Sequence, residues 1–270
     1  MGSTFNRIFF YNAKTARSGI PRLLPHRDFA LKIGVFIWEK SFSLARQMAY
    51  PTRDVYKNVA MIREMSTKDD FSGGVSEFYD KWAEHYDEDL ERAKYGGPVA
   101  CAEALCKLMS DKNALIVDIG AGTGRSGQEL AKCGFKRIDA VDFSQKSLDI
   151  STSKGVYERL ICDSVGKNKL KGVTDGYYSG LLCVGAIAAG HISQDAFPEF
   201  TRIVKKGGIM VFTVSKVTLP TDGQIQKKII QGIQDAINDL VRTGVWEVVE
   251  KTSITYLHDN EADRFIIRRL

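Results

Sequence analysis

The chain has 270 residues, of which 44% are hydrophobic and 26% charged, and its formal net charge is +5. This length and this balance fit one soluble α/β domain with a sizeable core and some additional elements, and they exclude a disordered chain. The basic residues are scattered, which gives nucleic-acid binding no support. The five cysteines contain no Cys-x-x-Cys pair, which favours reduced intracellular thiols over disulfides or a metal site.

Residues 1–66 differ in character from the rest. Five basic residues precede the first acid, Asp28, and apolar residues lie between them. Such a segment is typical of a mitochondrial transit peptide, but sparse serine and the lack of a clear cleavage site favour an ordinary N-terminal extension. The apolar run 29–38 is interrupted by Lys32 and is too short to span a bilayer. We expect a cytoplasmic protein without integral membrane association, with a mitochondrial location as the alternative.

The segment 76–92 predicts an amphipathic helix. Its aromatic face consists of Tyr79, Trp82, Ala83 and Tyr86, at helical spacing, and its acidic residues lie mainly on the other face. An aromatic stripe of this kind either packs into a core or covers a ligand, and aromatic faces suit cations. Both interpretations stay open at this point. A second helix is expected from Gly97 to Met109.

The next segment predicts a buried strand that runs into a ligand-binding turn. Residues 115–117 are apolar, Asp118 ends the strand, and glycines follow at alternate positions: Gly120, Gly122 and Gly124. These glycines allow backbone angles closed to other residues and let a ligand approach the main chain. A helix over 128–133, stopped by Gly134, would direct its free N–H groups at an anionic part of the ligand.

Two further strands are expected to end in acids. Strand 137–142 ends in Asp142, about 20 residues after the glycines, where a carboxylate can bind both hydroxyls of a ribose, and strand 157–163 ends in Asp163. The glycines also fit Gly-x-Gly-x-x-Gly if Gly127 is included, so an NAD-dependent oxidoreductase is the sharpest alternative. A tight turn without a ligand is the remaining interpretation.

The second half of the chain continues the alternation of strand and helix. We expect helix 145–154, strand 177–185, helix 195–204, a turn at 205–208, strand 208–214, and a long amphipathic helix ended by Gly244. Two final strands, 246–257 and 264–270, are separated by a polar loop. The sequence therefore predicts an α/β fold: a doubly wound, Rossmann-like, seven-stranded sheet, mostly parallel with an antiparallel C-terminal strand pair.

The pattern Asp-x-Gly-x-Gly-x-Gly followed by two acid-terminated strands resembles the class I S-adenosylmethionine (SAM) dependent methyltransferases. The stretch 182–208, with Val-Gly-Ala and Gly-His-Ile, is similar to the methyltransferase-like proteins of the Williams-Beuren syndrome chromosome region, as are segment 78–90 and Trp246-Glu247. Ser179 departs from their pattern, which has an Asp there. The resemblance covers roughly residues 70–250 and implies a methyltransferase domain over 67–270, preceded by the extension 1–66.

The resemblance also implies which residues hold SAM. The glycines would lie under its methionine part, Asp142 would hold the ribose and Asp163 would reach the adenine amino group. The expected cofactor-binding residues are Tyr79, Trp82, Tyr86, Asp118, Gly120, Ala121, Gly122, Gly124, Asp142, Phe143, Ser144, Asp163, Ser164, Val184 and Gly185.

The end of the fourth strand should face the methyl acceptor. His191 follows it and is the candidate general base, although its position favours a structural role in the loop slightly more, since many methyl acceptors need no base. The residues before it are small and apolar, which favours a small organic acceptor, and the Asn/Asp-Pro-Pro-Tyr/Phe signature of amino-group methylation is absent. The expected reaction is direct in-line methyl transfer, with a catalytically silent SAM-binding protein as a further alternative. No motif specifies the acceptor or the oligomeric state.

Overall fold

The computed structural model describes residues 51–66, 74–188, 191–216 and 223–270. All of them belong to the compact unit Gln47–Leu270, one of two into which the chain divides. The interpretations of residues 1–50, including the transit peptide, lie outside the described residues. Within the described ranges, no helix combines the length and apolar character that crossing a membrane requires.

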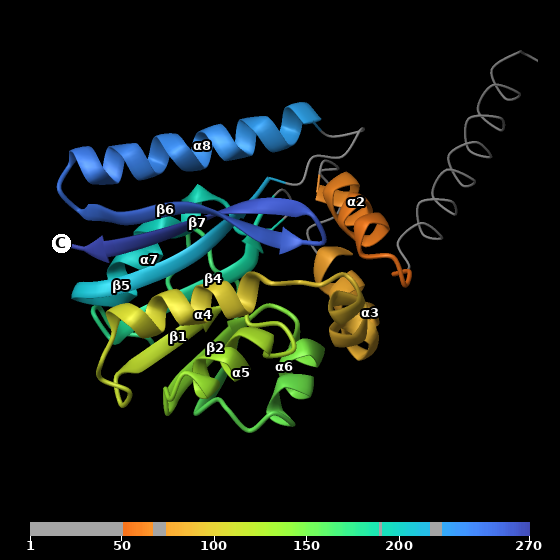
Figure 1. Cartoon of the computed structure of the whole chain (residues 1–270), viewed down its shortest axis with the longest axis horizontal. Helices are drawn as coiled ribbons and strands as arrows, with labels where there is room; N and C mark the ends of the chain where they lie inside the picture. The colour runs from red at the N-terminus through yellow and green to blue at the C-terminus, as the bar shows by residue number, and fades with distance from the viewer. Residues whose placement is uncertain (1–50, 67–73, 189–190, 217–222) are drawn as a thin grey trace, which may run out of the picture. The chain divides into compact units, whose positions relative to one another are not determined.

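Seven strands form a single sheet, as predicted (Figure 1). The strands are β1 (Leu115–Ile119), β2 (Arg137–Asp142), β3 (Arg159–Cys162), β4 (Tyr178–Ile187), β5 (Val204–Ser215), β6 (Trp246–Leu257) and β7 (Asn260–Arg269). Their order is β3-β2-β1-β4-β5-β7-β6, and β7 runs antiparallel to both of its neighbours. The order reverses between β1 and β4, and ligands of open α/β sheets bind beyond the carboxyl ends of the strands at such a point.

Helices cover both faces of this sheet. They are α2 (Val55–Ser66), α3 (Gly74–Arg92), α4 (Gly97–Leu108), α5 (Arg125–Lys132), α6 (Gln145–Thr152), α7 (Phe197–Ile203) and α8 (Gly223–Arg242), with a short 3-10 turn, η1 (Gln194–Ala196), before α7. Alternate strand residues point to opposite faces, so Val117 packs with α7 and α8 whereas Ile116 packs with α4 and α5. The central strands β1, β2 and β4 are therefore buried on both sides, as parallel strands require.

Helix α5 begins three residues earlier than expected. Gly124, with φ of +91°, forms its N-cap, and the helix runs from Arg125, so Gly127 lies inside it. A Cβ on Gly127 would approach the hydroxyl oxygen of Tyr157 to 2.4 Å, so close packing explains this helical glycine. Gly134 has φ of +92° and follows the end of the helix, as predicted.

Two expected connections are parts of strands instead. The predicted turn 205–208 lies within β5, where Tyr178 pairs with Val204 but Gly180 pairs with Ile209, so the extra residues bulge. The predicted loop 258–263 shrinks to a two-residue turn at His258, and most of its polar residues belong to β7. Charged residues are compatible with a strand here because salt bridges pair them, as between Lys216 Nζ and Asp263 Oδ1 at 2.7 Å.

Candidate functional site

The glycine loop joins β1 to α5 at the carboxyl edge of the sheet. Gly122 has φ of +53°, and a Cβ there would meet nothing within 4 Å, so backbone conformation rather than crowding favours glycine. Gly120 has φ of +69° and also lies so close to Ala186 that a Cβ would approach its methyl group to 2.4 Å. The backbone N–H groups of Gly120 and Ala121 both donate to Val141 O, which fastens the loop to the end of β2.

Asp142 lies at the end of β2, as predicted from the sequence. Its Oδ2 accepts a hydrogen bond from Gly122 N at 2.8 Å, and its Oδ1 accepts one from Ser144 N at 2.9 Å. Burial raises the pKa of Asp142, while these backbone N–H groups favour its ionised form. The carboxylate thus connects the glycine loop with the turn before α6.

Asp118 is almost completely buried at the end of β1. Its Oδ2 accepts a hydrogen bond from the Tyr157 hydroxyl at 2.7 Å, whereas its Oδ1 has no hydrogen-bond partner among the described residues. Burial raises the pKa of Asp118 to about 7; the Tyr157 hydroxyl opposes this shift, and the nearby charge of Asp142 adds to it. Tyr157 could not be predicted as a site residue, because nothing in the sequence near position 157 indicates that its ring will pack against Gly124 and Gly127.

Asp163 and Ser164 follow β3 and lie nearer the surface. Asp163 N donates to Asp142 O at 3.0 Å, so the ends of the two strands lie together. The Asp163 carboxylate accepts hydrogen bonds from Ser164 N at 2.9 Å and from Lys171 N at 3.4 Å. The structure therefore brings Asp163 beside Asp142, while the side chain of Ser164 is exposed.

The aromatic face of α3 divides into a core part and a part that borders the turn after β2. Trp82 is 3% exposed, packs against Phe78, and donates from Nε1 to Asp89 Oδ2 at 2.9 Å, so it is a core residue. Tyr79 contacts Phe143, in the turn after β2, with ring centroids 5.8 Å apart, and Tyr86 at 6.2 Å. The core interpretation is therefore confirmed for Trp82, while covering of a ligand by Tyr79 and Tyr86 stays a prediction.

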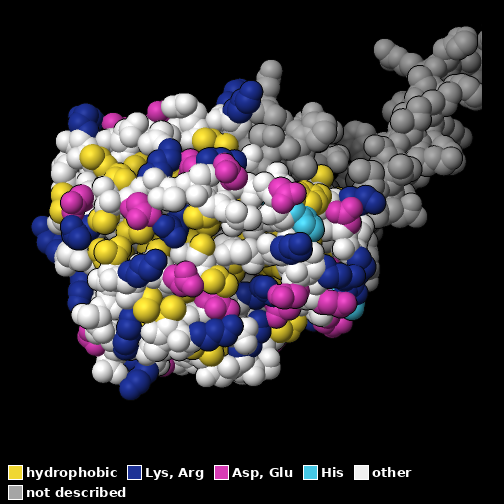
Figure 2. Space-filling view, viewed as in Figure 1, with side chains coloured by type: hydrophobic (Ala, Val, Ile, Leu, Met, Phe, Trp, Pro, Cys, Tyr) yellow, Lys and Arg dark blue, Asp and Glu magenta, His cyan; other side chains and the backbone are white. Residues whose placement is uncertain are grey.

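The acidic face of α3 binds the loops beneath it, rather than facing only solvent. Asp87 accepts hydrogen bonds from Thr123 Oγ1 in the glycine loop at 2.5 Å and from Lys154 Nζ at 2.7 Å. Asp80 accepts one from Ser144 Oγ at 2.5 Å. Figure 2 shows acidic and basic side chains next to one another over this part of the surface, at the right of the view. These contacts hold α3 across the ends of β1 and β2.

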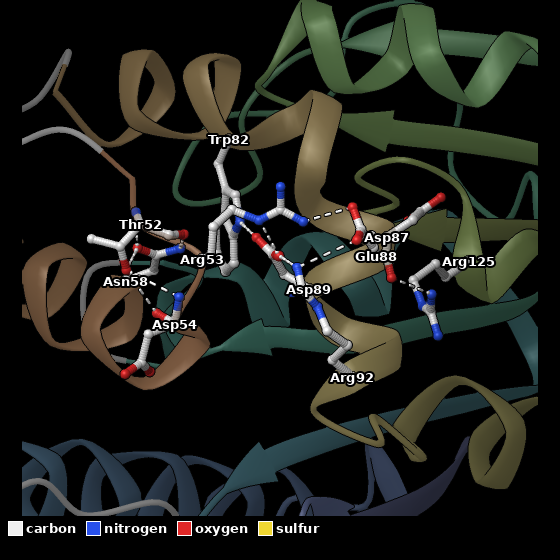
Figure 3. Close-up of polar contacts among 10 residues, drawn as sticks. All are labelled: Thr52, Arg53, Asp54, Asn58, Trp82, Asp87, Glu88, Asp89, Arg92 and Arg125. Carbon is white, nitrogen blue, oxygen red and sulfur yellow. Dashed lines mark hydrogen bonds and ion pairs between the residues drawn. The ribbon is translucent and has the colours of Figure 1, made fainter.

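The segment before α2 binds the outer side of α3 (Figure 3). Arg53 donates from Nε to Asp89 Oδ1 at 2.7 Å and from Nη2 to Glu88 Oε2 at 2.6 Å, and Arg92 donates to Asp89 Oδ1 at 2.6 Å. Asp54 caps α2 by accepting from the next backbone N–H groups. Residues 51–66, which the sequence suggested were part of an extension, thus belong to the same compact unit as the site.

Val184 and Gly185 lie at the end of β4. Gly185 N donates to Thr213 Oγ1 at 2.9 Å, and with φ of +78° a Cβ there would lie 2.3 Å from the Tyr95 hydroxyl oxygen. The rings of Tyr95 and Tyr256 meet edge to face at 5.0 Å. These two tyrosines could not be predicted as neighbours of the site, because their partners lie far away along the chain.

His191 reaches α3 from the loop after β4. Its Nε2 lies 2.6 Å from the Tyr79 hydroxyl oxygen, and the two rings meet edge to face at 5.6 Å. Its backbone N–H donates to Ala188 O at 3.1 Å. Burial raises the pKa of Tyr79, so the phenol keeps its proton near neutral pH. The structure therefore joins His191 to the aromatic residues of α3 at the end of the sheet where β1 and β4 meet.

Comparisons with known proteins agree with this arrangement. A family model described as a methyltransferase domain matches residues 116–208. Human methyltransferase-like protein 27 is 30% identical over 172 residues, which are 63% of this chain and 67% of that protein. The matched region of the family model begins in β1 and ends in β5, so it contains the glycine loop, Asp142 and the end of β4.

Two solved structures share the fold. A candidate SAM-dependent methyltransferase from Methanococcus maripaludis has a TM-score of 0.51 and 19% identity, over 72% of this chain and 93% of its own. The complex of the Haloferax volcanii Trm112 methyltransferase activator with a candidate methyltransferase gives a TM-score of 0.51 and 15% identity. This match covers 70% of the present chain and 96% of the chain in that structure. With the same sheet, a matching domain model and a human relative of this identity, the chain belongs to the methyltransferase family and has its class I fold.

Proposed function

We propose that the chain is a SAM-dependent methyltransferase that transfers a methyl group by direct in-line displacement to a small organic acceptor. The observation that carries this proposal is the convergence of Asp118, the glycine loop and Asp142 at the carboxyl ends of β1 and β2. This is the point at which the strand order reverses and at which open α/β sheets bind ligands.

The polar groups of the site suit SAM. The ligand carries an ammonium group, and Asp118 Oδ1 is a buried carboxylate oxygen without a partner among the described residues, which an ammonium would satisfy. An ionised carboxylate accepts about four hydrogen bonds. Gly122 N bonds to one oxygen of Asp142 and Ser144 N to the other, so the carboxylate keeps acceptor capacity for a ribose.

SAM supplies an activated methyl group when it is bound. The protein's own residues therefore have to bind SAM and the acceptor, orient them toward each other and exclude water from the site. Tyr79, Tyr86 and Phe143 offer aromatic surface to a cation, and Trp82 holds the two tyrosines by packing against them. We assign the other cofactor-binding residues, from the glycine loop to Gly185, to the same site.

His191 is the proposed general base. Its contact with the Tyr79 hydroxyl occupies Nε2, so base catalysis through this atom requires the acceptor to displace the phenol. Tyr79 would then hold the imidazole in place until the acceptor arrives. An acceptor that needs no deprotonation leaves His191 with the structural role of joining the β4 loop to α3.

Three finer assignments belong to this proposal. We infer that the chain is of the same kind as the Williams-Beuren syndrome region methyltransferase-like proteins, that it acts in the cytoplasm, and that its catalytic domain follows an N-terminal extension. The contacts of Arg53 with α3 support a domain that begins before α2 rather than at residue 67. The family match favours methyl transfer over the NAD-dependent alternative.

Isothermal titration calorimetry with SAM and with NADH tests the proposal. Asp142→Asn should weaken SAM binding about 10- to 150-fold, because a charged hydrogen-bond acceptor contributes about 1.5–3 kcal/mol. Asp149→Asn is the matched control, because this carboxylate lies on the exposed side of α6 and bonds only to Gln145 in the described contacts. Unchanged SAM affinity in Asp142→Asn, or tighter binding of NADH than of SAM by the parent protein, would contradict the assignment.

A further inference from the structure

Two cysteines lie together at the ends of α4 and α5, away from the carboxyl edge of the sheet. Cys106 is in the last turn of α4, and Cys133 caps α5. The Cys106 thiol donates a hydrogen bond to Cys133 O, with Sγ 3.6 Å from that oxygen. Lys112 Nζ lies 3.1 Å from Cys106 Sγ. None of these three residues takes part in the proposed methyltransferase site.

The Lys112 ammonium is held in place by several contacts. It donates hydrogen bonds to Cys106 O at 3.1 Å and to Met109 O at 2.8 Å, and it lies 4.3 Å from the centroid of the Phe135 ring. A fixed cation at this distance favours the thiolate over the thiol. Its effect outweighs that of the negative Glu103, and the pKa of Cys106 lies below its ordinary value.

Cys133 supports the same ionisation. Burial raises the pKa of the Cys133 thiol to about 11, and the adjacent sulfur of Cys106 contributes. Cys133 therefore keeps its proton near neutral pH and can donate a hydrogen bond to a Cys106 thiolate. Lys112, Cys133 and Glu103 are the titratable groups that face Cys106, and α4 itself opposes the thiolate with the negative end of its dipole.

The remaining cysteines have opposite surroundings. Cys101 and Cys183 are buried, and burial raises the pKa of both. Cys162 is exposed, but partial burial and the neighbouring acids, Asp142 first among them, raise its pKa. Exposure therefore favours reaction at Cys162, whereas stabilisation of the thiolate favours Cys106.

We propose that Cys106 is a modification site for peroxides and other soft electrophiles, with Lys112 stabilising its thiolate and Cys133 as the resolving thiol. With hydrogen peroxide, the Cys106 sulfur forms a bond to one oxygen while the O–O bond breaks, and the other oxygen leaves as water after taking up protons. The Cys133 sulfur then attacks the resulting sulfenic acid, the S–S bond forms, the S–O bond breaks, and a second water leaves. Two thiols are oxidised to a disulfide, and one peroxide is reduced to two waters.

Brief alkylation of the intact protein with iodoacetamide at pH 7, followed by peptide mass spectrometry, compares the two thiols. Cys106 should react at least about threefold faster than Cys162, despite its lower exposure. Lys112→Met should abolish this preference, whereas Lys112→Arg should keep it. Lys107→Met removes a neighbouring positive charge on α4 and is the matched control, with no expected effect. Faster reaction of Cys162 in the parent, or an unchanged preference in a folded Lys112→Met variant, would overturn the proposal.

Peroxide treatment tests the role of Cys133. Non-reducing peptide maps of the parent should contain the disulfide between Cys106 and Cys133. In Cys133→Ala, Cys106 should instead stop at the sulfenic acid, which dimedone traps. A persistent sulfenic acid in the parent would overturn the assignment of Cys133. Neither experiment depends on methyl transfer, so its outcome is independent of the proposed function.

Discussion

Replacing Asp89 with asparagine removes the charge at the centre of the contacts between α3 and the segment before α2, while the side chain keeps its size. The Asp89 side chain is inaccessible to solvent, and its carboxylate accepts hydrogen bonds from Trp82, Arg53 and Arg92 over 2.6–2.9 Å. A hydrogen bond to a charged group contributes about 1.5–3 kcal/mol. The two arginine side chains are 45% and 54% exposed, so water compensates for much of what they lose.

We therefore expect Asp89→Asn to lower the free energy of unfolding by about 2 kcal/mol, and the midpoint of thermal unfolding by about 4–8 °C. Urea unfolding at pH 7, followed by circular dichroism, measures this change. Glu88→Gln is the control, because Glu88 binds the same arginines from the exposed surface, and no measurable loss is expected. An Asp89→Asn variant as stable as the parent would refute the idea that this carboxylate holds α3 in place.

The same substitution has a predictable pH dependence. Burial opposes ionisation of Asp89, but the hydrogen bonds from Trp82 and Arg53 outweigh it and hold its pKa below the ordinary value. Such a group stabilises the folded state above its unfolded pKa, and the contribution is lost as the pH falls through the folded pKa. The difference in stability between parent and variant should therefore shrink below about pH 4. A difference that grows toward acid pH would contradict the assignment.

Two further predictions follow from the packing of α2 and the burial of Asp118. Removing residues 1–46 should leave thermal stability and affinity for S-adenosylhomocysteine unchanged. Removing residues 1–65 should lower both, because this longer truncation removes Arg53 and most of α2. Equal results for the two truncated chains in scanning fluorimetry would contradict this prediction. Burial raises the pKa of Asp118 to about 7, so the stability of the parent should fall as the pH rises from about 4 to 7, because the folded state binds a proton that the unfolded state releases. Asp118→Asn should flatten that slope, and an unchanged slope in the variant's denaturation curves would show that Asp118 ionises normally.

The regular parts of the fold could be predicted from the sequence because their signals are local. Strand β2 has the expected limits, since a short run rich in apolar residues between Arg137 and the terminal Asp142 marks them directly. The start of α5 could not be predicted, because glycines disfavour helix and only the distant Tyr157 explains why Gly127 lies inside one. The same holds for the bulge in β5, which depends on its pairing with β4.

Parts of the candidate site could be predicted where a residue type that suits a ligand directly follows a predicted strand, as for Asp142 and the glycine loop. Tyr157, Tyr95 and Tyr256 were not, since each acquires its place through partners on other elements. The acids of α3 show the same limit. A helical pattern separates apolar from polar faces, but it does not distinguish a face in water from one that binds Thr123 and Lys154.

The position of β7 between β5 and β6 has a consequence for synthesis of the chain on the ribosome. Strand β6 is made before β7, yet its ladder in the sheet is with β7 alone. Until residues 260–269 have emerged, the nascent chain therefore holds β5 as an open edge, and Phe212 lacks the stacked ring of Phe265. An unpaired apolar edge of this kind is prone to pair with other chains. The nascent protein is therefore most exposed to pairing with other chains after β5 has formed and before the final hairpin closes the sheet.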